Sequence, residues 1–261
     1  MPVAAPGLRS TDGHDAPTAT TTAPIRGARI PLALLAVASA LSGCITVGQS
    51  VTRTEGPHAQ VTGAKVLIIE PEVRLWVLDP VGVRQPQAEW TAAGLRHVRV
   101  AIAEELRARG IEPASYTASD DASRNRSHEQ VVKLHRIVFR MAQLQQVGQF
   151  RLPTKTDRLD WTLGDAVQGL REESGADYAL FVSFDDSYQS AGVVGSALLI
   201  TLTLGIVAPP PGQQVGAASL VDLRTGNLVW MRSFNRQGAG DLRQLPPARA
   251  AVQTLLKDLP R

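Results

Sequence analysis

The chain of 261 residues contains a single cysteine, few aromatic residues and no run of basic residues. One cysteine excludes an internal disulfide and any metal site built from several thiolates. Aromatic residues make up 5% of the chain, which leaves little material for a nucleic-acid surface that stacks bases. The formal net charge of +3 is spread along the chain, so we expect neither nucleic acid nor another polyanion as a partner.

The sequence also lacks the local patterns that mark common enzyme classes. It contains no G-x-S-x-G elbow, no G-x-x-x-x-G-K-S/T phosphate loop and no H-E-x-x-H helix. The chain has five histidines: His14, His58, His97, His128 and His135. The last two are seven residues apart, whereas a metal pair on a helix needs a spacing of three or four, so we expect solvated surface histidines and no metal site.

Asp185 and Asp186, at the end of an expected strand, are the best carboxylate pair. Paired carboxylates at such a place bind a cation or act as general acid and base in some proteins. The commoner role is to end the strand and to cap the next element, and we favour it here. The sequence therefore predicts no enzymatic activity and no cofactor.

Near the amino terminus, a basic flank precedes a short apolar run. Residues 1–25 are rich in Ala, Pro and Thr, a composition that we expect to be unstructured. Arg26 and Arg29 then precede an uncharged run from Ile30 to Leu41. A basic flank before an apolar run of this length is typical of a secretory signal peptide, and the run is shorter than the roughly 20 residues of a membrane-spanning helix.

The apolar run ends in Leu41-Ser42-Gly43-Cys44, and this motif resembles the lipobox of bacterial lipoproteins. The resemblance implies that a diacylglyceryl group is attached to the Cys44 thiol, that a peptidase cuts before this residue, and that the new amino terminus is acylated. Two or more acyl chains give stable membrane attachment. The alternative is an ordinary transmembrane anchor, because residues 30–52 carry no charge.

Cleavage before Cys44 divides the chain into three parts. We expect a disordered leader and signal peptide at 1–43, the lipidated cysteine and a flexible tether at 44–63, and a folded domain at 64–261. Ile45 stands where Asp favours inner-membrane retention in proteobacterial lipoproteins. The resemblance therefore implies the periplasmic face of the outer membrane, or the cell membrane if the source is Gram-positive.

The apolar pattern of the folded part predicts one α/β domain, a mixed β-sheet with helices packed on it. Strands are expected at 65–70, 73–78, 178–184, 218–223 and 228–231. Helices are expected at 88–109, from 127 onward, at 162–173 and at 247–259, with a loop at 115–126. The second of these helices is expected to face the core with Val131, Leu134, Val138 and Met141.

The segment 224–227, between two of these strands, predicts a tight hairpin. Gly226 is expected at positive φ, and the Asp222 side chain is expected to accept hydrogen bonds from the amides of Thr225 or Gly226. Trp230 is expected to lie across the sheet as a buried apolar anchor. The alternative is that Trp230 is an exposed anchor for a partner.

The segment Gly175-Ala176-Asp177, which enters a buried strand, and the Val221–Trp230 hairpin resemble a group of bacterial envelope lipoproteins. Their domain is similar to the amino-terminal domain of the Tol-system translocation protein. It is shared by the curli secretion channel lipoprotein and by the lipoprotein activators of penicillin-binding proteins. The resemblance covers residues 64–258 in outline and implies a domain without a common enzymatic activity.

No charged residue occurs from Ser187 to Val221, and residues 191–208 are almost all apolar or small. This run is a core segment, a surface for a partner or for self-association, or a membrane-inserted segment. As a surface, its tentative contact residues, together with one from the hairpin, are Leu199, Leu202, Leu204 and Trp230. Strict alternation, as in inserted hairpins, extends only over 200–204, and we favour the core.

These patterns predict a non-enzymatic envelope lipoprotein, a periplasmic binding or assembly module anchored to the outer membrane. Its lipid would hold it at the membrane, and its domain would dock a protein partner. The alternative is an oligomeric subunit of an export or secretion apparatus that inserts into a membrane through residues 191–208.

Overall fold

The structure is a computed structural model, and it describes residues 49–53, 61–79, 83–117, 120–146, 152–154, 159–190, 195, 202–203, 212–237 and 240–260. These residues form an α/β domain with a mixed sheet and helices packed on it, which confirms the predicted fold class. The elements are β1 (Gln49–Arg53), β2 (Lys65–Ile68), β3 (Glu72–Leu78), β4 (Arg84–Pro86), α2 (Ala88–Ala108), β5 (Glu112–Ser115), α3 (Ala122–Gln146), the 3₁₀ helix η2 (Gly164–Val167), α4 (Gln168–Ser174), β6 (Tyr178–Gln189), β7 (Gln213–Asp222), β8 (Leu228–Gln237) and α6 (Leu245–Leu256).

One eight-stranded sheet organises the described part of the chain, with the order β1-β8-β7-β6-β2-β5. The long strand β6 is central: β7 runs antiparallel along one of its edges, and β2 and β3 follow one another, both parallel to β6, along the other. β5 continues the sheet beside β2, and β4 continues it beside β3. β8 and β1 lie beyond β7, each antiparallel to its neighbour.

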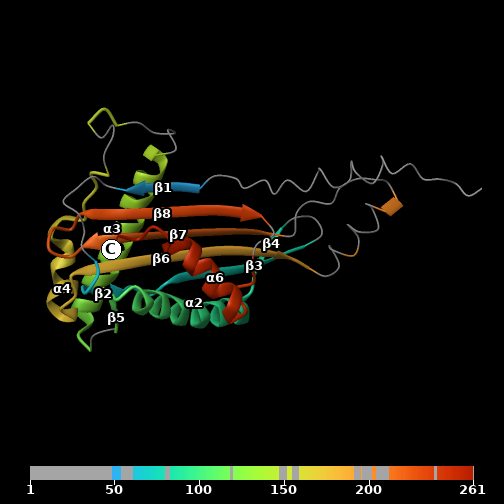
Figure 1. Ribbon diagram of the computed structural model, residues 1–261, viewed down its shortest axis with the longest axis horizontal. Coiled ribbons are helices and arrows are strands. Elements are labelled where there is room, and N and C mark those ends of the chain that lie inside the picture. The colour runs from blue at the N-terminus through green and yellow to red at the C-terminus, as the bar shows by residue number, and fades with distance from the viewer. Residues whose placement is uncertain are drawn as a thin grey trace, which may run out of the picture. The chain divides into compact units, whose positions relative to one another are not determined.

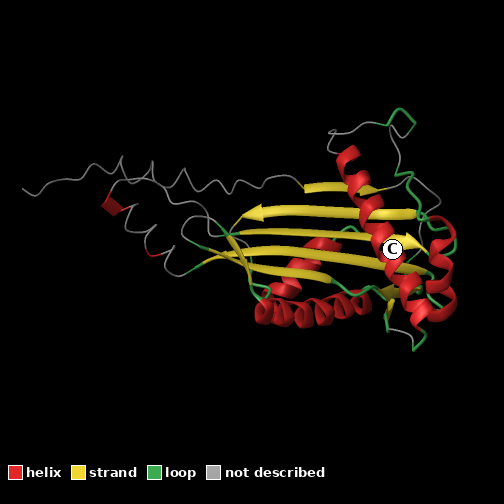
Figure 2. Cartoon of the chain, turned by 180° about the vertical axis from the view of Figure 1, so that it is seen from behind, coloured by secondary structure: helices red, strands yellow, loops and turns green. Residues whose placement is uncertain are grey.

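Helices cover the two faces of this sheet unequally. In Figure 1, α2 and α6 lie in front of the sheet and pack against each other. The apolar core beneath them contains large side chains that are fully buried, among them Leu75, Ile102, Leu106, Phe184 and Trp230. Figure 2 shows the opposite face, where α3 crosses the strands obliquely and leaves the part of the sheet toward β3 and β4 without a described helix in front of it.

α3 faces the sheet with a different set of residues from the one expected. The buried positions are His128, Val131, His135 and Ala142, which follow one another at helical spacing. Leu134 is 37% exposed, so the expectation that it faces the core is wrong. The expectation that both histidines are solvated is also wrong, because each side chain finds a polar partner beneath the helix, and such partners make burial of a polar ring tolerable.

One strand and one helix boundary differ from the sequence prediction because their segments are polar. The sequence does not predict β5, since Glu112 and Pro113 give it no apolar alternation; its position comes from parallel main-chain pairing with β2. α3 begins at Ala122 rather than at Ser127. The Asp121 carboxylate accepts a hydrogen bond from the Ser123 amide at 2.7 Å, which satisfies a free N–H group of the first turn.

The hairpin between β7 and β8 contains the expected glycine. Gly226 has φ +73°, and a Cβ there would lie 2.3 Å from the carbonyl oxygen of Gly164, so only glycine fits. The Asp222 side chain accepts a hydrogen bond in the turn, as expected, but the predicted donor is wrong. Oδ1 of Asp222 accepts from the amide of Arg224 at 2.7 Å, while the Gly226 amide donates to the main-chain carbonyl of Asp222 at 2.8 Å.

β1 lies within the segment that the sequence marks as a tether. Its main chain pairs antiparallel with β8, with Gln49 opposite Phe234 and Arg53 opposite Trp230. At least these five residues extend the sheet by one strand. Only a few residues therefore separate Cys44 from Gln49, the first residue of the sheet.

Candidate functional site

The predicted binding residues do not form one site in the described part of the chain. Cys44, Leu199 and Leu204 lie outside the described residues. Leu202 is 76% exposed. Trp230 is fully buried in the core beneath α2 and α6, as the structural interpretation expected, so its indole ring is not available to a partner.

Asp185 and Asp186 point to opposite faces of the sheet, as successive residues of a strand do. The carboxylate of Asp185 lies on the α3 face, where it accepts a hydrogen bond from the indole N–H of Trp76 at 3.2 Å. Ion pairs with Arg74 and Arg84, at 3.3 Å and 3.1 Å, complete its surroundings. The two carboxylates therefore cannot act together on a cation or as an acid and base pair.

Asp186 belongs to a buried polar network on the α2 and α6 face. Its Oδ2 accepts hydrogen bonds from the hydroxyl of Tyr188 at 2.7 Å and from the side-chain amide of Gln214 at 2.8 Å. The Tyr188 oxygen in turn accepts from the amide of Leu242 at 3.0 Å, which ties β6 to the segment before α6. Burial raises the pKa of Asp186 to about 6, and the two hydrogen bonds oppose this rise.

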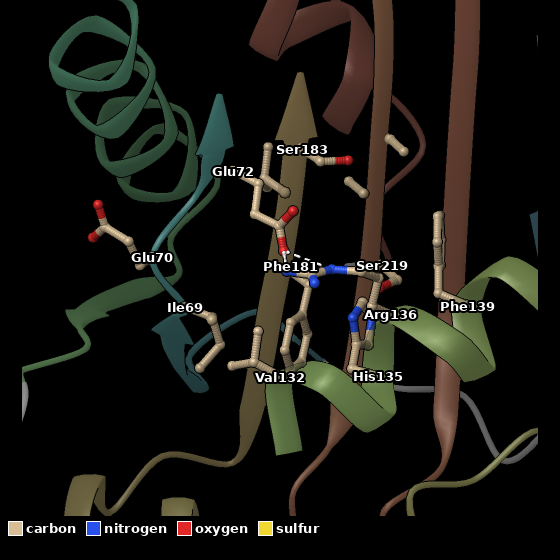
Figure 3. Close-up of a pocket in the computed structure, with 13 residues that line it drawn as sticks. Ile69, Glu70, Glu72, Val132, His135, Arg136, Phe139, Phe181, Ser183 and Ser219 are labelled. Carbon is tan, nitrogen blue, oxygen red and sulfur yellow. Dashed lines mark hydrogen bonds and ion pairs between the residues drawn. The ribbon is translucent and has the colours of Figure 1, made fainter. Parts of the chain in front are cut away.

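His135 reaches from α3 to the sheet, and Figure 3 shows it beside Ser219 and Phe181. Its Nε2 lies 2.7 Å from the hydroxyl of Ser219, and its ring stacks on Phe181 with the ring centroids 3.6 Å apart. Burial lowers the pKa of His135 to about 3, and the charge of the neighbouring Arg136 adds to this effect. The ring is therefore neutral at physiological pH.

A neutral imidazole beside a serine hydroxyl is one requirement of a nucleophilic site. Ser219 is completely buried, however, and the cavity that His135 and Ser219 line has a volume of about 70 Å³. At ~30 Å³ for each molecule, this is space for a few waters rather than for a substrate. The pair therefore holds α3 on β7, and its geometry does not favour nucleophilic catalysis.

A larger cavity of about 300 Å³ lies farther along α3. Its apolar lining consists of Ile69, Val132 and Leu170. Its charged lining residues are Glu70, Glu129, Lys133 and Arg136. The two cavities share Ile69, Glu70, Val132 and Arg136, and we call the depression that they form together the α3 groove. An apolar lining with a few charged groups and this volume are typical of ligand and peptide sites.

One wall of the α3 groove is held by a chain of three polar side chains. The carboxylate of Glu173 lies 3.3 Å from Nε2 of His128, and the hydroxyl of Tyr116 lies 3.1 Å from Nδ1. If Nε2 carries the proton that faces the carboxylate, Nδ1 accepts the Tyr116 hydroxyl. Burial raises the pKa of Tyr116, and the charge of Glu173 adds to the rise, so this phenol stays protonated. These contacts between Glu173, His128 and Tyr116 fix α3 relative to α4 and to the residue after β5.

Comparisons with known proteins find similarity at the level of structure only. No family model and no curated protein matches the chain. Among solved structures, the chain is similar to the PelC dodecamer from Paraburkholderia phytofirmans, with a TM-score of 0.39 and 14% identity over 80% of this chain and 95% of that one. Lipoprotein GNA1162 from Neisseria meningitidis gives 0.31 and 13% over 75% and 97%. The LpoB C-terminal domain from Salmonella enterica gives 0.27 and 15% over 70% and 87%. Similarity at this level carries no statement about partners or activity.

Metal sites and membrane-spanning helices are two further kinds of functional feature. Within the described ranges, no group of three or more His, Cys, Asp or Glu side chains is arranged to hold a metal ion. None of the helices in that part of the chain is long and apolar enough to cross a membrane. The volume and the lining of the α3 groove make it the site that the described geometry favours for binding.

The sequence contained a signal for the buried face of α3 that the argument from metal-ligand spacing missed. His128, Val131 and His135 are separated by three and four residues, which places both histidines on the same helix face as a buried valine. The partners that make this burial tolerable, Ser219 and Glu173, are remote in the sequence. No local pattern around α3 indicates them.

Proposed function

We propose that the protein is a non-enzymatic lipoprotein, a periplasmic binding or assembly module held at the outer membrane by acyl chains on Cys44. The observation that carries this proposal is the position of the only cysteine, directly after Leu41-Ser42-Gly43 and behind a basic flank and an apolar run. The α/β domain that follows is the part of the protein that such an anchor would keep at the membrane. Ile45, in place of Asp, supports the outer membrane over the inner one.

Substitution of the cysteine tests the anchor directly. Cys44→Ser should abolish acylation and leave an unprocessed precursor, because serine has no thiol for the thioether bond. Ser50→Ala, six residues farther along, is the matched control and should be processed like the parent. Mass spectrometry of the envelope fraction measures both. A Cys44→Ser protein with the parent's mature mass and detergent partitioning would contradict the lipoprotein assignment.

The α3 groove is the surface that we propose for the partner. Its support is the combination of an apolar lining, with Ile69 and Leu170 almost fully buried, and exposed charges on Glu129 and Lys133. Such a surface pairs a desolvated centre with a polar rim, as binding interfaces do. The charges of both signs favour a protein segment with mixed charge over a strongly charged polymer.

A photo-crosslinking amino acid tests this surface in the intact envelope. Placed at Lys133, at the groove, it should capture one discrete protein, because a bound partner would lie against this side chain. Placed at Gln253, an exposed position of α6 on the other face, it should not. Equal capture from both positions, or capture from position 253 alone, would remove the groove from the proposal.

A second candidate function is an oligomeric subunit of an export or secretion apparatus. The observation that favours it is the exposure of large apolar side chains: Leu202 at 76%, Ile137 at 65% and Leu134 at 37%. The size of the acyl-free mature protein separates the two candidates. A ring-sized oligomer supports the apparatus subunit, and a monomer supports the binding module.

A further inference from the structure

The outer side of α3 carries an apolar stripe that the rest of the domain leaves partly uncovered. Its members are separated by three, four and three residues: Leu134, Ile137, Met141 and Leu144. Leu134 and Ile137 are 37% and 65% exposed, and the other two side chains are partly exposed. In Figure 2, no described helix or strand lies over α3. We call these four residues the α3 stripe.

The α3 stripe is separate from the two other functional sides of the helix. The buried side, with Val131 and His135, faces the sheet. Three residues at intervals of four, His128, Val132 and Arg136, line the α3 groove. At 3.6 residues per turn, the centre of the stripe lies about 130° around the helix from the buried side, and the groove lies on the opposite flank.

The spacing of the stripe is that of a seam between two helices. Apolar residues at alternating intervals of three and four occupy positions a and d of a heptad, where a second helix packs its own apolar side chains between them. Such a seam is narrower than the apolar side of an ordinary amphipathic helix, and this one contains neither Trp nor Phe, which helices that lie on a membrane bury. The stripe therefore fits a helix better than a lipid surface.

A row of basic residues follows one side of the stripe. Arg126, Lys133 and Arg140 are exposed and seven residues apart, so all three occupy heptad position g. The only acidic residue of α3 is Glu129, whose carboxylate lies 3.7 Å from Nζ of Lys133. Three cations against this one carboxylate leave a net charge of +2. The ion pair is exposed on both sides, so it contributes little and is readily exchanged for another partner.

The other basic residues of α3 do not change this count. Arg136 pairs with Glu72 on the side of the groove, at 2.6 Å. Arg124 pairs with Asp121 at the start of the helix, at 3.6 Å. Each of these pairs is neutral, so the positive charge along the stripe is that of the row.

A second copy of α3 would not satisfy this row. In antiparallel packing of two helices, the g positions of one face those of the other, so the two basic rows would repel each other. In parallel packing, each row would face the e positions of the other copy, which are Val131, Val138 and Gln145. Charge complementarity instead favours a helix that carries acidic residues on both sides of its apolar seam.

We propose that the α3 stripe docks an amphipathic helix of another protein, with apolar residues at a and d and acidic residues at e and g. The seam supplies apolar contact, and the basic row sets the preference for an acidic partner. This surface is additional to the α3 groove, and the proposal does not depend on the lipid anchor.

Two peptides of three heptads test the proposal on the full-length protein in nanodiscs of phosphatidylcholine, a lipid without net charge. Both carry leucine at a and d; one has glutamate at e and g, and the other has lysine there. Like charges keep either peptide from pairing with itself. We expect the glutamate peptide to bind roughly tenfold more tightly than the lysine peptide, because only its flanks complement the row. Fluorescence anisotropy measures both, with empty nanodiscs as background.

Variants assign this binding to the stripe. Ile137→Glu places a charge in the seam at an exposed position, so it should abolish binding of the glutamate peptide and leave the melting temperature unchanged. Val100→Glu makes the same change at an exposed valine of α2 and should bind like the parent. The double variant Arg126→Glu and Arg140→Glu reverses the charge of the row and should prefer the lysine peptide. A merely structural role of α3 would not produce that reversal.

Every other result overturns the proposal. Equal binding of the two peptides, or binding of neither, would show that the row and the seam do not recognise an acidic helix. A dimer that Ile137→Glu dissociates would assign the stripe to a second copy and support the apparatus subunit. Binding of the Cys44→Ser chain to phosphatidylglycerol vesicles, lost on addition of Ile137→Glu, would assign the stripe to the lipid surface. None of these results bears on acylation of Cys44 or on capture at the α3 groove.

Discussion

Apolar cores close both faces of the sheet, and the two faces differ in the polar contacts that accompany them. On one face α2 and α6 bury an apolar layer that includes Phe184 and Trp230. On the other face α3 is held at two points by histidines, His128 between Tyr116 and Glu173, and His135 on Ser219. Both faces are stabilised by apolar area removed from water, since Leu67, Phe181 and Met231 are buried on the α3 face. The α3 face depends in addition on a few directional bonds and on the neutral ring of His135.

This difference makes the α3 face the adjustable one. Apolar packing is insensitive to pH and sensitive to changes of side-chain volume, while protonation of a buried imidazole places an unfavourable charge in the interior. The α3 groove and the open part of the sheet also lie on this face (Figure 2). Binding and conformational response are thus expected on the α3 face, and resistance to unfolding on the other.

The largest effect is expected from the apolar face. Trp230→Ala should lower the free energy of unfolding by about 3–5 kcal/mol, because a fully buried indole leaves a large cavity. Denaturant unfolding measures this loss. Leu134→Ala, on the exposed side of α3, is the control and should change stability by less than about 0.5 kcal/mol. A Trp230→Ala protein as stable as the parent would show that the core beneath α2 and α6 does not carry the fold.

The strands that are covered on both faces and the helix α2 were more predictable than α3. Short apolar runs such as Val66–Ile69 and Tyr178–Phe184 indicate buried strands by themselves. A strand with one exposed face alternates polar and apolar residues, whereas a strand covered on both faces is apolar throughout. β2, β3 and the start of β6 follow these runs. The buried stripe of α2 likewise follows the spacing of Val98, Ile102 and Leu106.

The α3 face was predicted less well because its determinants are polar and remote in the sequence. A histidine is buried only where a partner exists, and Ser219 reaches His135 across a large part of the chain. Glu173 reaches His128 in the same way. The α3 groove exists only after these contacts are made, so neither composition nor periodicity indicates it.

The next effect is a pH dependence that comes from His135. Its pKa falls to about 3 in the folded state, against about 6.5 for an exposed histidine, so the folded state binds this proton less readily than the unfolded one. Stability from this group is complete above pH 6.5 and is lost as the pH falls from 6.5 toward 3, by at most about 1.4 kcal/mol for each pH unit. His135→Gln keeps a hydrogen-bonding group beside Ser219 and should remove this loss.

Urea unfolding of the parent and of His135→Gln between pH 7.5 and pH 4.5 measures the difference. The two curves of unfolding free energy against pH should diverge below pH 6.5, with the variant becoming relatively more stable as the pH falls. A constant offset over the whole range would mean that His135 is already protonated, or exposed, in the folded protein. Hydrogen exchange of α3 amides locates the change, since the helix should open first.

The smallest effect is expected from Asp186, and its sign is opposite. Its pKa rises to about 6 in the folded state, against 3.8 for an exposed aspartate, so the folded state binds this proton more readily than the unfolded one. Stability from this group is complete below pH 3.8 and is lost as the pH rises through 6. Between pH 4 and pH 6 it therefore opposes the contribution of His135. Asp186→Asn removes the cost of a buried charge and should stabilise the protein by about 1 kcal/mol or more at pH 7.5, with a smaller gain at pH 4.5. If the gain is the same at both pH values, the carboxylate does not titrate in this range, and the α2 and α6 face is insensitive to pH at this position.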